Sequence, residues 1–74
     1  MESLRLLIQV DAVPYYKEAA ERMLNRSAIL VGEPELEDSP NTYIILTAPS
    51  YMEIAAVCHL AGYIERDKWN KHDT

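Results

Sequence analysis

Hydrophobic residues alternate with more polar ones at the start of the chain and recur with a helical period after it. Every second residue from Leu4 to Val10 is apolar, which is the pattern of a strand with one buried face. A turn at residues 11–14 follows. From Tyr16 to Leu24 the apolar residues keep to one helical face, and Asn25 is suited to end such a helix. The first third of the chain therefore predicts a strand followed by an amphipathic helix.

Two short apolar runs rich in β-branched residues come next. Residues 28–31 and 42–47 are apolar on both faces and predict two further strands. The connection from Gly32 to Asn41 is longer than a typical hairpin loop and contains two prolines. It also contains four acidic residues and no basic one: Glu33, Glu35, Glu37 and Asp38.

A helix start is predicted at Ser50, because Ser50-Tyr51-Met52-Glu53 matches a capping box. The residues that follow, from Ile54 to Ala61, are apolar nearly all around the helix, which favours burial on more than one side. In so small a chain one sheet can cover only one side, so we expect a self-association surface on this helix. Its expected residues are Met52, Ala55, Ala56, Val57, His59 and Tyr63.

The end of this helix is open on the sequence. Gly62 is suited to terminate it, in which case Tyr63–Arg66 could form a short fourth strand; otherwise the helix continues toward Lys68. The expected fold class is a two-layer α+β sandwich with the order β-α-β-β-α. With the fourth strand it would have the ferredoxin-like order β-α-β-β-α-β. We expect one domain over residues 1–66 and a polar C-terminal tail over residues 67–74.

Size and cysteine content favour a partner. The chain has 74 residues, and a domain of that length buries only roughly 60% of the surface that its unfolded chain exposes. Cys58 is the only cysteine, which excludes an intrachain disulfide and disfavours a structural metal. Burial against another chain, most simply in a homodimer, is the remaining way to stabilise so small a domain. We expect no metal and no other cofactor.

The location expected from the sequence is the cytoplasm. A lone cysteine fits a reducing compartment, and the N-terminal residues 1–5 do not have the basic and apolar regions of a signal peptide. No run of residues approaches the roughly 20 apolar positions of a membrane-spanning helix.

Charge indicates the kind of partner. The net charge is −5, which disfavours direct binding to a nucleic-acid backbone. Without the four acidic residues between Gly32 and Asn41, the other eight acidic side chains nearly balance the seven basic ones. We therefore expect these four residues to dock a protein partner with a basic surface, although a solvated loop that keeps the hairpin soluble explains them about equally well.

Catalytic motifs are not evident, and we predict no catalytic residue. Two glycines are too few for a phosphate-binding loop or a dinucleotide fingerprint. Cys58 and His59 are adjacent on the predicted helix, so their side chains diverge by roughly 100°. A nucleophilic cysteine usually lies in an electropositive, partly exposed setting, whereas Cys58 lies among apolar residues.

Three kinds of function follow from these features. The first is a non-enzymatic interaction module, either a homodimer or an accessory or inhibitor subunit, with a nucleic-acid mimic of the phage-inhibitor type as a specific form. The second is a ferredoxin-like regulatory dimer that senses a small ligand. The third is an accessory subunit of a larger enzyme. Composition and pattern favour the first of these.

Overall fold

The computed structural model describes residues 1–34 and 38–72, which form three strands and two α-helices, with a short 3-10 turn before and after the first helix. The chain passes through these elements in the predicted order, strand, helix, strand, strand, helix. Their bounds are β1 Glu2–Gln9, η1 Val10–Ala12, α1 Val13–Met23, η2 Arg26–Ala28, β2 Ile29–Pro34, β3 Asn41–Ala48 and α2 Tyr51–His72.

The three strands form one antiparallel sheet in the order β1-β3-β2. β1 pairs with β3 without interruption, from Glu2 opposite Ala48 to Gln9 opposite Asn41. The pairing of β2 with β3 is irregular, because its register shifts between Val31 and Pro34. β1 and β2 are therefore the two edges of the sheet, and they differ in regularity.

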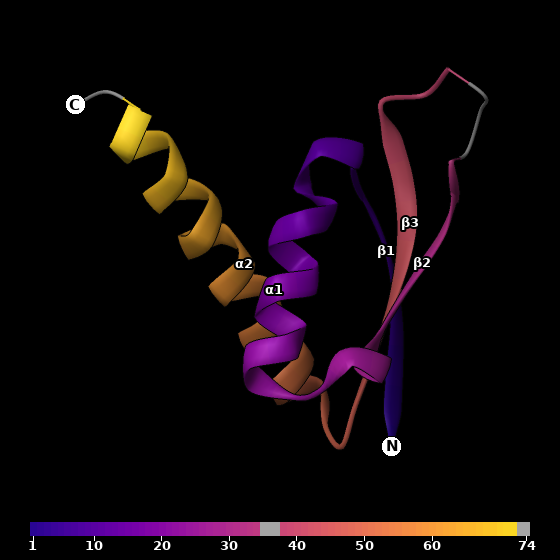
Figure 1. The fold of residues 1–74 in the computed structure, drawn as a ribbon. Helices are drawn as coiled ribbons and strands as arrows, with labels where there is room; N and C mark the ends of the chain where they lie inside the picture. Colours follow the sequence, from indigo (N-terminus) through magenta and orange to yellow (C-terminus); the bar gives the residue numbers. More distant parts are fainter. Residues whose placement is uncertain (35–37, 73–74) are drawn as a thin grey trace.

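Both helices lie on the same side of the sheet (Figure 1). The layer between them and the sheet is the core, in which Ile44 and Leu46 of β3 contribute the largest buried strand side chains and Ile54 and Val57 the largest helical ones. Small residues fill the rest of the core: Ala19, Ala20, Ala28, Ala48 and Ala61. Small side chains allow elements to approach closely, and this core is accordingly thin.

The predicted α+β class with two layers is confirmed, but the described residues contain no fourth strand. Residues Tyr63–Arg66, which could have formed one, belong to α2, and the helix continues through Gly62 to His72. Ile64 packs against the core cluster, and the Lys68 ammonium lies 5.8 Å from the centre of the Tyr15 ring on α1. These contacts with α1 favour helix over strand here. The predicted boundary between residues 66 and 67 falls within this helix.

Gly32 and Gly62 occupy opposite kinds of environment. A Cβ atom at Gly32 would lie 3.1 Å from the carbonyl oxygen of Tyr43, at the irregular part of the sheet, where Thr42 Oγ1 also donates a hydrogen bond to the Gly32 carbonyl. A Cβ atom at Gly62 would meet no atom of the described chain within 4 Å. Close packing thus explains a glycine at position 32 and does not explain one at position 62.

These environments predict opposite effects of alanine. Gly62→Ala should raise the free energy of unfolding by about 1 kcal/mol, because glycine in a helix interior is less favourable than alanine by that amount. Gly32→Ala, the matched control, should lower it, because the backbone of β3 would have to shift. Urea denaturation of both variants measures the two changes. A stabilising Gly32→Ala would contradict the packing described for the β2–β3 pair.

Candidate interaction surface

The first turn of α2 is capped by Ser50 and linked to the sheet by Tyr51. The Glu53 amide donates a hydrogen bond to Ser50 Oγ at 3.4 Å, which is the serine half of the predicted capping box. Glu53 Oε2 is buried, with no hydrogen-bond partner in the part of the chain that the structure describes. A hydrogen bond between Tyr51 and Glu2 raises the pKa of the Tyr51 phenol and links the start of α2 to the start of β1.

The face of α2 that points away from the sheet carries an apolar groove. Met52 and Tyr63 lie three turns apart on this face and are 82% and 57% exposed. The ring of Tyr63 packs edge to face against the ring of His59, one turn earlier on the helix, with 5.0 Å between the ring centres. The residues lining the groove come from α2 and from the end of α1: Met23, Met52, Ala55, Ala56, His59, Leu60 and Tyr63. We refer to these seven residues as the α2 groove.

Five of the six residues predicted for self-association line the α2 groove, and the sixth does not. Val57 is 0% exposed and lies in the core, because its position on the helix points toward the sheet. Ala56 is half-buried beside α1, and Ala55 is exposed. Met23 and Leu60 were not predicted as surface residues, because their apolar character favoured the core; both line the groove in the structure.

The open face of the sheet is a second uncovered surface. Leu7 and Leu30 are exposed on it, one on each edge strand. The Arg5 guanidinium lies 4.5 Å from the centre of the Tyr43 ring, a cation–π contact between β1 and β3. Ser3 and Thr47 share a hydrogen bond of 2.9 Å across the same two strands. This face therefore mixes exposed leucines with polar contacts and is less uniformly apolar than the α2 groove.

The acidic segment is described only at its ends. Glu33 belongs to β2 and Asp38 lies before β3, and both are exposed. Glu35 and Glu37 lie outside the described residues. Glu33 is thus on β2, the edge strand on the opposite side of β3 from β1, and Asp38 lies in the connection that leads into β3.

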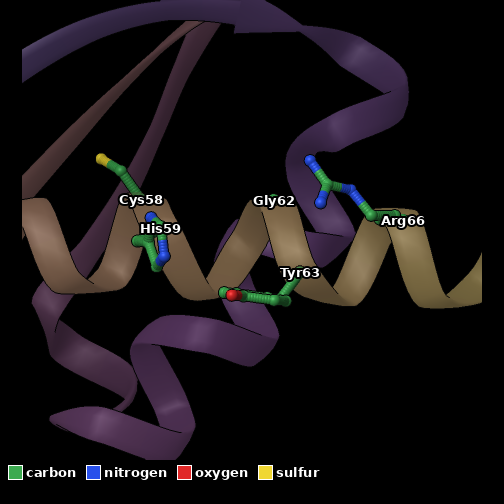
Figure 2. A pocket seen from close by; sticks show the side chains of 5 residues that line it. All are labelled: Cys58, His59, Gly62, Tyr63 and Arg66. Carbon is green, nitrogen blue, oxygen red and sulfur yellow. The ribbon is translucent and has the colours of Figure 1, made fainter.

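Cys58 and His59 diverge as their adjacent positions predict (Figure 2). A shallow groove along α2 is lined by Cys58, His59, Gly62, Tyr63 and Arg66. The Cys58 and Arg66 side chains extend from the same side of the helix, with the bare backbone of Gly62 between them. Burial raises the pKa of the Cys58 thiol above its ordinary value. Among the described residues, no three His, Cys, Asp or Glu side chains are grouped as metal ligands.

Comparison with known proteins gave no match to a family model, to a curated protein or to a solved structure. Neither helix, over the residues that the structure describes, combines the length and apolar character needed to span a bilayer. The site must therefore be interpreted from its own geometry.

Because the pKa of the Cys58 thiol is raised, we expect this thiol to react slowly with alkylating reagents. The pH at which iodoacetamide alkylation of Cys58 reaches half its maximal rate should be higher in the folded chain than in the same chain unfolded in urea, because only the thiolate reacts. By linkage, the folded state loses stability as the pH rises through this raised value. Mass spectrometry of the alkylated chain gives both profiles. A lower midpoint in the folded chain would indicate an activated thiolate and would support an enzymatic role.

Proposed function

We propose that this chain is a non-enzymatic protein-interaction module, a homodimer or an accessory or inhibitor subunit, that buries the α2 groove against another protein chain and docks a basic partner through its acidic segment. The observation that carries the proposal is the exposure of Met52 and Tyr63 on a helix whose opposite face forms the core. Large apolar side chains gathered in one groove mark interaction sites on soluble proteins.

The composition of the groove supports a protein partner. Methionine adapts its shape to a partner surface, and Met23 and Met52 lie at the groove. Tyrosine is enriched among residues that dominate binding energy, and Tyr63 is held in place by its ring contact with His59. None of the seven side chains is a carboxylate, lysine or arginine, so a partner can bury the groove without burying an unpaired permanent charge.

The acidic segment supports the proposal that the partner has a basic surface and that charge discriminates among possible partners. Its described members, Glu33 on β2 and Asp38 ahead of β3, are both exposed. Clustered carboxylates increase the rate of encounter with a basic surface and disfavour acidic competitors. A nucleic-acid-binding protein offers such a surface, which is the basis for the inhibitor or mimic form of the proposal.

The first test changes the α2 groove. Met52→Glu should leave the melting temperature nearly unchanged, because the side chain is mostly exposed, and should weaken binding at the groove by tenfold or more, the order of magnitude expected when a central contact is lost. If the bound chain is a second copy, light scattering will show a lower mass. If it is a different protein, affinity purification will recover less of it.

Leu30→Glu is the matched control, since Leu30 is also an exposed apolar residue but lies on the open sheet face. It should leave both readouts unchanged. Equal losses from Met52→Glu and Leu30→Glu, or no loss from Met52→Glu, would remove the α2 groove from the proposal.

The second test reverses charge at the acidic segment. Replacing Glu33, Glu35, Glu37 and Asp38 by Lys should preserve the fold and abolish capture of the basic partner at low salt, where unscreened attraction is strongest. Affinity purification with mass spectrometry at low and high salt identifies which proteins depend on the segment.

Asp11→Lys combined with Glu18→Lys tests the effect of net charge outside the segment, because both residues are exposed. It changes the charge by +4, half of the +8 of the four-residue reversal, and it also removes the Glu18–Arg22 ion pair. Capture that survives the reversal of all four residues, or that falls equally in the control, would show that the segment only keeps the hairpin soluble.

A further inference from the structure

The two edges of the sheet are prepared differently for contact with another strand. The β2 edge is poorly suited to pair with another strand, because its own pairing is irregular between Val31 and Pro34 and proline cannot donate a backbone hydrogen bond. β1 is eight residues long, pairs with β3 without a bulge and contains no proline. A long, regular and partly apolar edge is a template for pairing with another strand. Only β1 has these properties here.

The backbone groups that β1 leaves free can be assigned from its pairing. The Val10 amide donates to the Pro40 carbonyl at 2.7 Å. Because hydrogen-bonded and non-hydrogen-bonded pairs alternate in an antiparallel ladder, Leu6 and Ile8 also bond toward β3. The amides and carbonyls of the alternate residues point away from the sheet, at Ser3, Arg5, Leu7 and Gln9.

The sequence of β1 matches a second copy of itself. With a two-fold axis at Leu6, residues 3–9 pair along their whole length and Arg5 lies opposite Leu7 of the second copy. The Arg5 guanidinium rests over Tyr43 of its own sheet, so its aliphatic stem can cover that leucine. An axis at Arg5 would instead place two guanidinium groups opposite each other, which is unfavourable. Of these two registers, charge favours the one with its axis at Leu6.

Uncovered apolar side chains support the same register. Leu4 is 40% exposed although α2 lies beside it. In this register Leu4 lies opposite Ile8 of the second copy and diagonal to its Leu6, within reach of both. Each copy therefore covers the residues that the other leaves open, which is the property of a two-fold interface.

The helix layer leaves room for the second copy. Leu4 lines a groove beside α2 together with Tyr51, Ile54, Ala55, Cys58 and His59. Cys58 and His59 also line the shallow groove that passes Gly62 (Figure 2). The flank of α2 next to β1 thus carries small residues at positions 55, 58 and 62, and Gly62 has no neighbour of its own chain that requires it. Small residues on this flank let another helix layer approach closely.

We propose that two copies of this chain pair through their β1 edges about a two-fold axis at Leu6, joining their sheets into one antiparallel six-stranded sheet. This inference rests on the proposed function, of which it specifies the homodimer, and it leaves the α2 groove and the acidic segment free for a different protein. No covalent bond is made or broken; the interface consists of backbone hydrogen bonds and the apolar contacts of Leu4, Leu6 and Ile8.

Amide hydrogen exchange at several protein concentrations tests the pairing directly. The Arg5 and Leu7 amides should exchange at a rate that falls in proportion to the monomer fraction, because only the second copy can bond them. The Leu6 and Ile8 amides are internal controls that bond β3 and should be protected at every concentration. Light scattering on the same samples gives the mass.

Two variants extend the test. Leu7→Pro removes an outward amide without breaking the ladder to β3, and Leu4→Lys places a charge between the copies; each should shift the chain to a folded monomer, as judged by light scattering and circular dichroism. If one of the two variants fails to fold, the other variant and the hydrogen-exchange data test the β1 interface. Met52→Glu should remain a dimer, since Met52 faces the α2 groove.

The outcomes separate this inference from the proposed function. A dimer with unprotected Arg5 and Leu7 amides, or one that Met52→Glu dissociates and Leu7→Pro does not, overturns the β1 interface and leaves the interaction module standing. A wild-type chain that is monomeric at millimolar concentration also overturns it. Partner capture that is unchanged by Met52→Glu and by the reversal of the acidic segment overturns the proposed function, whatever the state of β1.

Discussion

Coverage of α2 is the constraint on which the rest of the structure depends. A three-stranded sheet and one other helix can bury only part of the circumference of a helix, and here they bury the side that carries Ile54, Val57 and Ala61. The sequence places apolar residues well beyond that side. Met52 and Tyr63 are consequently left in water, at a cost in free energy that burial against another chain would remove.

Local signals in the sequence were sufficient for most of the fold. The alternation in β1, the period of α1 and the serine cap of α2 each depend on residues within a few positions of one another, and each is present in the structure. The continuation of α2 through Gly62 could not be predicted in this way. It depends on contacts between the second half of α2 and α1, such as that of Lys68 with Tyr15, which join residues far apart in the chain.

The surface was harder to predict than the fold for the same reason. An apolar helix pattern favours burial on more than one side but does not indicate which side faces the sheet, and Val57 was therefore assigned to the surface although it lies in the core. Met23 and Leu60 lie together at the α2 groove because α1 and α2 pack against each other, a contact between residues far apart in the chain. The free edge of β1 has no signature in its own residues, since it follows from the order in which the strands pair.

The unequal edges of the sheet have a consequence for how far assembly can proceed. Addition of strands is open-ended when both edges of a sheet accept a neighbour, and repeated addition of that kind produces fibrils. In this chain the irregular pairing of β2 and the proline at its end close one edge. Two copies joined at β1 would present β2 at both outer margins, so growth would stop at a finite, soluble particle.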